Sequence, residues 1–379
     1  MGKNKNSAGW RSRASALACL LAIVLLAGAS AAAAPMVVDP HATACVTPSV
    51  HYTTIQQAIN ASQAGGTVQV CPGVYPEQIS ITQPLTLKGV GANGGVSRIV
   101  LPASLVTYNT TVWPISAQVL VTTPNAKNVT LQNLVIDGSN SSTDCTAPYI
   151  GGIVFDSGTG GVVRGVSIQN QFVHGVNGYD CGSGIGIFAG DNSAVTIQSV
   201  EISNVDLLGV YEHKASVDVQ TSTISARNPM YRNKNNEGIY FDGGTGGSAT
   251  GNQVFDWSWG ITLWYPTVAI AVSNNQVVNC SANGIYCVAC NGQTISGNKL
   301  YRLGDQATGI NFYLGTGGNS IQNNLITQAR WGIYLNFSTG IDTISSNTLQ
   351  DLTFGVIAYA ADLQSSNKYY NDAVNLMLQ

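Results

Sequence analysis

A histidine and four charged residues that could perform acid–base chemistry fall in one part of the sequence. Glu212, His213 and Lys214 are consecutive, Arg227 follows them, and Asp242 comes 29 residues after the histidine. A histidine oriented by a carboxylate is a usable general base, and Lys or Arg can neutralise a uronate carboxyl group during β-elimination. The carboxylates of Glu212 and Asp242 would equally suit acid–base glycoside hydrolysis. Either reaction requires a fold that brings residues 212–214 and 242 together.

A repeated pair, a glycine followed by an aliphatic residue, indicates such a fold. The last five intervals between these pairs, from Gly238-Ile239 to Gly355-Val356, are 22, 24, 25, 23 and 23 residues. Short strands separated by Gly and Asn turns cannot bury their apolar face alone, but they form a continuous core when stacked coil on coil. The sequence therefore predicts an all-β fold, a single-stranded parallel β-helix of about ten coils with a short amino-terminal capping helix.

An asparagine also recurs at one position of the coil, in the set Asn252, Asn275, Asn298, Asn324 and Asn347. Asparagine tolerates left-handed backbone angles at turns. Side-chain amides stacked about 4.8 Å apart can form a ladder of hydrogen bonds. We interpret this column as structural.

The repeat assigns a side of the coil to each candidate. His213 and Asp242 share an outward position on successive coils, so we expect them about 5 Å apart. Glu212 falls at an inward position where the other coils have apolar residues. Burying an unpaired carboxylate is costly, so Glu212 should be paired with Lys214 or Arg227, protonated, or turned outward by a bulge.

Aromatic side chains recur at the outward positions of the same strands, namely Tyr211, Tyr240, Trp264, Tyr286 and Tyr313. Tyr and Trp on an exposed flat sheet beside polar groups suit the stacking of sugar rings. Two alternatives are that aromatic residues favour strands in any case and that loops cover the face. We nevertheless expect a face that binds polysaccharide or oligosaccharide.

The ends of the chain depart from the repeat. Lys3, Lys5, Arg11 and Arg13 precede an apolar stretch, 14–29, and a run of small residues with Ala-x-Ala sites after which cleavage would occur. This pattern is typical of a secretory signal peptide, and the apolar stretch is short for a membrane anchor of roughly 20 residues. We assign 1–34 to the signal peptide, 35–66 to an amino-terminal cap with a helix near 53–61, 67–368 to the β-helix and 369–379 to a carboxy-terminal cap. The mature chain should be secreted or periplasmic.

The opening of the mature chain resembles a known superfamily. The stretch Tyr52–Ile59, with Val68–Glu77 and Leu85–Gly89, is similar to the opening of right-handed parallel β-helix repeat proteins in the pectin lyase-like superfamily. This resemblance implies the fold but no single activity, because the superfamily holds lyases, glycosidases, esterases, epimerases and non-enzymes. The catalytic Gln-Asp and Asp-Phe segments of the methylesterases have no match here. The paired aspartates and Gly-His-Gly of the polygalacturonases have none either, so no catalytic residue is carried over.

The charge and the cysteine content of the chain bear on its binding partners and its disulfide bonds. The net charge of −3, with 9% charged residues, argues against nucleic-acid binding. An exported chain favours disulfides, and we expect Cys45 to pair with Cys71 and Cys145 with Cys181. Cys280, Cys287 and Cys290 would then leave one cysteine over.

No histidine or cysteine spacing resembles a zinc site, and no cofactor is expected, although calcium sites in β-helices can be assembled from separate coils. We expect a monomer that does not contact the membrane after signal cleavage. These observations favour a carbohydrate-active protein, either a polysaccharide lyase or a glycoside hydrolase acting on a plant or microbial polysaccharide. The alternative is a non-catalytic glycan-binding or cell-surface repeat protein.

Overall fold

The computed structural model describes residues 35–40, 45, 51–91, 94–139, 144–146, 148–176, 179–227, 235–363 and 366–379. The predicted signal peptide lies outside these ranges. In the part of the chain that the structure describes, no helix is long and apolar enough to cross a membrane.

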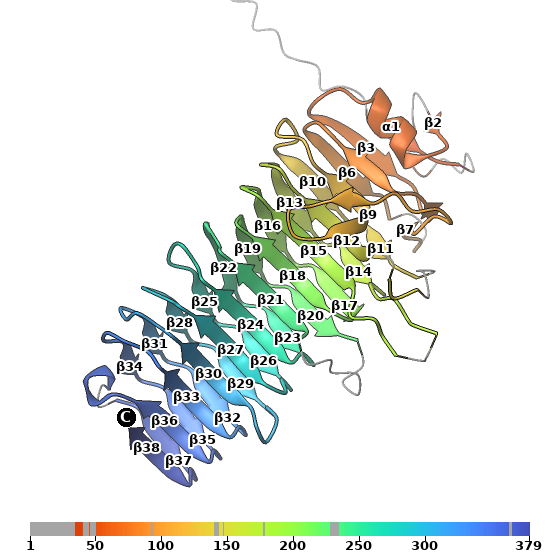
Figure 1. The fold of residues 1–379 in the computed structure, drawn as a ribbon. Helices are drawn as coiled ribbons and strands as arrows, with labels where there is room; N and C mark the ends of the chain where they lie inside the picture. Colours follow the sequence, from red (N-terminus) through yellow and green to blue (C-terminus); the bar gives the residue numbers. More distant parts are fainter. Residues whose placement is uncertain are drawn as a thin grey trace, which may run out of the picture. The chain divides into compact units, whose positions relative to one another are not determined.

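Three parallel sheets contain nearly all of the strands (Figure 1). The first, sheet A, has 13 strands in the order β2 (His51–Tyr52), β1 (Met36–Val38), β3 (Gly66–Val70), β6 (Leu85–Gly89), β10 (Val129–Gln132), β13 (Gly160–Arg164), β16 (Ala194–Gln198), β19 (Ser216–Gln220), β22 (Gly246–Thr250), β25 (Ala271–Ser273), β28 (Thr294–Ser296), β31 (Ser320–Gln322) and β34 (Thr343–Ser345).

The second, sheet B, has 12 strands, which are β4 (Gly73–Pro76), β7 (Ser97–Val100), β11 (Val135–Asp137), β14 (Ser167–Gln169), β17 (Glu201–Val205), β20 (Thr223–Ala226), β23 (Gln253–Phe255), β26 (Gln276–Val278), β29 (Lys299–Tyr301), β32 (Leu325–Thr327), β35 (Thr348–Gln350) and β37 (Lys368–Tyr370).

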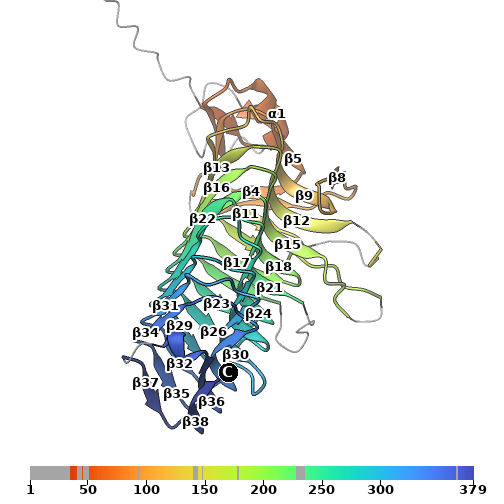
Figure 2. The same cartoon turned by 60° about the vertical axis from the view of Figure 1, so that its left-hand side comes forward.

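The third, sheet C, has 13 strands, which are β5 (Ile79–Ile81), β9 (Pro114–Val121), β12 (Tyr149–Phe155), β15 (Gly184–Gly190), β18 (Leu208–His213), β21 (Glu237–Asp242), β24 (Trp259–Trp264), β27 (Asn283–Val288), β30 (Thr308–Tyr313), β33 (Trp331–Asn336), β36 (Phe354–Ala358), β38 (Val374–Leu378) and β8 (Tyr108–Asn109), which runs antiparallel to β9. Figure 2 shows β9, β12, β15, β18, β21 and β24 following one another along the stack.

The chain passes through sheets A, B and C in turn, so each coil adds one strand to each sheet. The predicted right-handed parallel β-helix is confirmed, with slightly more strands in each sheet than the expected coils. The core is a column of inward aliphatic and aromatic side chains, with Trp257 among the largest that are fully buried. Each rung buries its apolar face only against its neighbours, as the repeat requires.

The predicted asparagine ladder is present at the corner between sheets A and B. Asn275 Oδ1 accepts from the backbone N–H and the side-chain amide of Asn252, at 2.9 and 3.0 Å. The same pair of bonds joins Asn275 to Asn298, and the ladder continues through Asn324 to Asn347.

One detail of the asparagine prediction is wrong. The left-handed backbone angles belong to the residues directly before the ladder, which are Gly251, Asn274, Gly297, Asn323 and Ser346. This turn aims the next side chain inward. The ladder amides therefore replace backbone hydrogen bonds that the corner cannot make.

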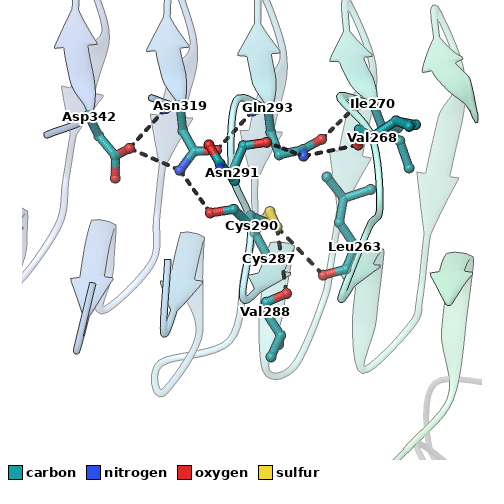
Figure 3. Close-up of a disulfide and its surroundings, with 10 residues drawn as sticks. All are labelled: Leu263, Val268, Ile270, Cys287, Val288, Cys290, Asn291, Gln293, Asn319 and Asp342. Atoms are coloured by element: carbon teal, nitrogen blue, oxygen red, sulfur yellow. Dashed lines mark hydrogen bonds between the residues drawn. A yellow bond between two sulfur atoms is a disulfide. The ribbon is translucent and has the colours of Figure 1, made fainter. Parts of the chain in front are cut away.

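A second polar ladder runs along the corner between sheets C and A (Figure 3). The backbone N–H of Gln293 donates to Asn319 Oδ1 at 2.8 Å, and that of Asn319 donates to Asp342 Oδ1 at 2.9 Å. The Asn319 amide also donates to the carbonyl of Cys290 at 3.3 Å, next to a disulfide between Cys290 and Cys287. Burial raises the pKa of Asp342, whose Oδ2 has no partner among the described residues.

The two ends of the stack differ. Helix α1 (Ile55–Ala61) covers the first rung with Ile55, Ala58 and Ile59, and the Thr54 side chain caps it by accepting from the Gln57 N–H. The tail, expected to be a cap that breaks the repeat, instead adds β37 to sheet B and β38 to sheet C. Its last strand carries exposed apolar side chains.

Both expected disulfides are present, Cys45–Cys71 and Cys145–Cys181, with Cα–Cα distances of 5.8 and 5.2 Å. The Cys287–Cys290 bond lies in the core, and Cys280 is also buried.

Replacement of Asn298 by Ala tests the ladder. It would leave the two Asn275 donors and the Val272 carbonyl without their hydrogen-bond partners in the core. We expect a loss of about 2–4 kcal/mol in the free energy of unfolding, measured by urea denaturation. Asn60→Ala, at an exposed position of α1, should change stability by less than about 0.5 kcal/mol; equal losses in the two variants would contradict a special role for the ladder.

The disulfides should differ in their rate of reduction, because a reductant must reach the sulfur. Cys145 is exposed and Cys181 half-buried, whereas Cys287 and Cys290 are inaccessible. With mild reductant and iodoacetamide on the folded protein, mass spectrometry should find label first on Cys145 and Cys181. Cys287 and Cys290 should be labelled only after unfolding in urea, so early labelling of that pair would show that the rungs open locally.

Candidate functional site

The candidate residues meet on the outer face of sheet C, where β18, β21 and β24 are adjacent. Parallel pairing places Tyr211 beside Tyr240 and His213 beside Asp242. The next rung continues these two columns with Thr262 and Trp264. The predicted adjacency of His213 and Asp242 is therefore confirmed, while their catalytic role stays a prediction.

The contact between these two side chains is direct. His213 Nδ1 lies 2.8 Å from Asp242 Oδ2, and the Tyr211 hydroxyl donates to the same oxygen at 2.9 Å. Burial by itself would raise the pKa of Asp242, but the hydrogen bonds from His213 and Tyr211 and the positive charge of Lys214 hold it below its usual range. An ionised Asp242 fixes the proton of a neutral His213 on Nδ1, which leaves Nε2 as the basic nitrogen.

Tyr211 is not part of an exposed platform, contrary to the prediction. Its side chain is only 2% exposed and belongs to an apolar cluster on the outside of sheet C. Trp113, directly before β9, packs on it with ring centroids 5.2 Å apart, and Phe188 does so at 5.4 Å. Burial and the neighbouring Asp242 raise the pKa of the Tyr211 hydroxyl, so it acts as a donor that positions Asp242.

Glu212 points into the core, as its inward position predicts, but without the expected cation. Its side chain is 0% exposed, and Oε1 accepts from the Ala215 N–H. Within the described residues it forms no ion pair with Lys214 or Arg227, and Oε2 has no partner. Burial, and to a smaller extent Asp242, raise the pKa of Glu212 to about 8, so the carboxyl group is protonated at neutral pH. The expected pairing is wrong, and the protonated alternative fits.

Arg227 is engaged elsewhere. Its Nε lies 2.7 Å from Asp180 Oδ2, and its guanidinium lies 3.4 Å from the Phe172 ring centroid. Asp180 is also 3.0 Å from His174 Nδ1. Arg227 therefore joins Phe172 and Asp180 and is not beside His213. Lys214, by contrast, is exposed and next to the candidate base.

The other four predicted aromatic residues, Tyr240, Trp264, Tyr286 and Tyr313, lie half-buried on the outer face of sheet C. Tyr240 stacks on Tyr211 with centroids 5.2 Å apart, and Trp264 meets Tyr286 edge-on at 6.4 Å. This arrangement leaves parts of the rings accessible to a ligand.

Two more acidic residues lie on this face, and neither was assigned a role from the sequence. Asp156 directly follows β12 in the column of His213, with Gly190 between them; it is 2% exposed and burial raises its pKa. Glu237, the first residue of β21, is buried beside Leu208 and Trp259. The column pattern contained a signal for Asp156, whereas the burial of Glu237 depends on packing that the repeat does not encode.

Replacing Glu212 by Gln tests whether this side chain is structural. The pKa of Glu212 is higher in the folded state than in the unfolded one. The free energy of unfolding therefore falls as the pH rises from about 4.5 to about 8, because the unfolded state ionises in this range while the folded state stays protonated. The variant should therefore gain stability over the wild type across that window, by at most about 1.4 kcal/mol per pH unit. Urea denaturation at pH 5, 7 and 9 measures this, and a pH-independent difference would show that Glu212 is ionised in the fold.

Solved structures of the same fold include several proteins that act on glycans. The A-module of the Azotobacter vinelandii mannuronan C-5 epimerase AlgE4 is 14% identical, covers 86% of this chain and 92% of its own length, and superposes with a TM-score of 0.58. The GH136 lacto-N-biosidase from Eubacterium ramulus is 12% identical, with 91% and 68% covered and a TM-score of 0.55. A mannuronic acid-specific polysaccharide family 6 lyase from the human gut microbiota is 13% identical, with 83% and 81% covered and a TM-score of 0.51. At these identities the likeness shows the fold alone.

No curated protein sequence matches the chain. A family profile does match, over residues 164–374, which is more than half of the 379 residues. The family is described as periplasmic copper-binding protein (NosD). This agrees with the secreted or periplasmic location that the amino terminus predicts. The chain belongs to the NosD family.

Proposed function

We propose that the outer face of sheet C binds a polysaccharide and that His213 acts there as a general base on a uronate residue. The observation that carries the proposal is the His213–Asp242 contact of 2.8 Å, which leaves Nε2 of a neutral imidazole as the basic nitrogen. Lys214 is the adjacent cation that would neutralise the uronate carboxylate.

The reaction would be a β-elimination. His213 Nε2 takes the proton from the carbon next to the carboxylate, and the electrons of that C–H bond form a carbon–carbon double bond. The glycosidic C–O bond on the next carbon breaks, and the leaving oxygen takes a proton from water. Negative charge builds up on the carboxylate during proton removal, which is where the Lys214 ammonium group would act.

Hydrolysis by Glu212 and Asp242 has less support. Glu212 points into the core and is 0% exposed, so it cannot share a substrate with Asp242 on the outer face. Elimination requires only one base and one cation, which His213 and Lys214 would supply. Two of the structures that share the fold are described as acting on mannuronan or mannuronic acid, so polyuronates are the first class of substrate to test.

Copper, which the family description mentions, finds no fitting site in the part of the chain that the structure describes. Copper prefers histidine, methionine and thiolate ligands. The described residues contain no group of three or more His, Cys, Asp or Glu side chains that could hold a metal ion. Six cysteines are in disulfides, and His213 and His174 each contact a carboxylate. We derive no step that involves the metal.

A non-catalytic glycan-binding protein is the second candidate. One observation favours it: the His213 side chain is only 15% exposed, and Tyr211 beside it is covered by Trp113. Binding by the half-buried aromatic side chains would not require access to the imidazole.

A panel of polysaccharides tests both candidates. Purified mature protein, with and without calcium, should release unsaturated product from a polyuronate, read as absorbance near 235 nm, with new reducing ends measured in parallel. His213→Ala should lower the rate at least about 100-fold, because general-base catalysis contributes roughly 10²–10⁴-fold. Asp242→Asn should also lower it by removing the carboxylate that orients the imidazole.

His174→Ala is the matched control, since His174 forms a similar contact with Asp180 away from the candidate site. It should leave the rate within about twofold. No unsaturated product from any uronan, with glycan binding retained, would replace the elimination proposal with the binding candidate. New reducing ends without unsaturation would indicate hydrolysis.

A further inference from the structure

Glu237 has an environment that the proposed elimination does not explain. It opens β21 on the outer face of sheet C, in register with Leu208 of the outer apolar cluster and with Trp259 of the next rung. The residue is 5% exposed and its side chain interacts with Thr262 on the next rung, but no hydrogen bond of ordinary geometry with a described residue satisfies its buried Oε2. A buried carboxyl oxygen without a partner is costly unless water or a ligand supplies one.

Two more polar atoms on the following rungs share this condition. Thr262 Oγ1 on β24 and Asn311 Oδ1 on β30 are buried, and neither forms a hydrogen bond of ordinary geometry with a described residue, although the Thr262 side chain lies close enough to Glu237 to lower its pKa. Asn311 keeps its orientation because its amide donates to Asn283 Oδ1 at 3.2 Å. Parallel pairing puts Thr262, Tyr286 and Asn311 at the same position of three successive rungs. The unpartnered atoms therefore follow one stretch of the outer face.

Aromatic rings border this stretch. Trp259 and Tyr286 have ring centroids 5.8 Å apart, and both are half-buried. Sugar rings combine apolar faces with hydroxyl groups, so they suit a site where aromatic faces lie beside free hydrogen-bonding groups.

The charge of the stretch indicates which sugars it would accept. The strands β21, β24, β27 and β30 contain no Lys or Arg. Burial raises the pKa of Glu237 to about 8, against a lowering contact with Thr262 and with a smaller upward contribution from Asp242 on the same strand. Tyr240 and Tyr286 are the titratable groups that also interact with it. At neutral pH Glu237 is thus an uncharged donor, and no cation is present on these strands to compensate a uronate.

We propose that Glu237 and Asn311 form a subsite for successive uncharged, hydroxyl-bearing sugar residues, stacked against Trp259 and Tyr286. This inference rests on the proposed function and deepens it, because a chain along the stack would meet Lys214 and His213 on one rung and this subsite on the next ones. The substrate would then be a heteropolysaccharide that contains both uronate and neutral residues. The protonated Glu237 carboxyl group donates to a sugar hydroxyl, and Asn311 Oδ1 accepts from one.

Titration calorimetry of the mature chain tests the subsite. The probes are cellohexaose, mannohexaose and xylohexaose as neutral ligands, and hexagalacturonate as the charged one. At pH 7 at least one neutral hexasaccharide should bind, and Glu237→Ala should weaken it about tenfold, the effect of one lost buried hydrogen bond. Glu237→Gln, which keeps a donor, should stay within about threefold.

The control is Glu201→Ala, at an exposed position of β17 in sheet B, which should leave the affinity unchanged. Above pH 8 the wild type should lose affinity while Glu237→Gln does not, because ionisation removes the donor only in the former. Thermal melts establish that each variant is folded. The subsite is wrong if no neutral hexasaccharide binds or if Glu237→Ala binds as the wild type does, in which case water fills the buried positions.

The elimination assay on the same preparations separates the two proposals. Elimination that depends on His213, with neutral binding unaffected by Glu237→Ala, would overturn the subsite and leave the proposed reaction standing. Neutral binding that depends on Glu237, without elimination from any uronan, would overturn the reaction and support the subsite.

Discussion

In-register pairing between successive rungs is the constraint on which the rest of the structure depends. Every strand of the three sheets has to place its backbone donors and acceptors opposite those of the next coil, so equivalent residues lie above one another in columns. A shift of one residue would exchange the core side chains with the outer ones. The corners cannot complete this pattern with backbone groups alone, and buried side-chain amides such as Asn275 and Asn319 take their place.

The columns explain which features could be predicted from the sequence. The spacing of Gly209-Val210 and Gly238-Ile239 fixes the register of β18 against β21, and the contact of His213 with Asp242 follows from it. The same periodicity predicted the core and the asparagine ladder. These features are repeated and local to neighbouring rungs, so alternation and spacing are sufficient to find them.

The failed predictions at the candidate site mostly concern contacts made by segments outside the repeat. Tyr211 is covered by Trp113, which belongs to the connection before β9, and Arg227 pairs with Asp180 from another connection. No periodicity relates these segments to β18. The sequence placed Glu212 on the correct side of the strand but predicted an ion pair that does not form. A buried carboxyl group can avoid the cost of its charge by becoming neutral instead of pairing with a cation. The composition favours a neutral carboxyl group, since this chain has only 16 Lys and Arg residues to supply a cation.

The Asn ladder also has a consequence for how such a chain can change in length. Each ladder residue bonds only with the coils next to it, so a duplicated coil with the same corner would find complete partners on both sides. Duplication of one coil beyond β24 would leave the distance between His213 and Asp242 intact while it lengthened the surface beside them. A segment of 22–25 residues, which is one coil, is thus the natural unit of insertion in this protein. The His213–Asp242 site can stay constant while the outer face of sheet C grows longer.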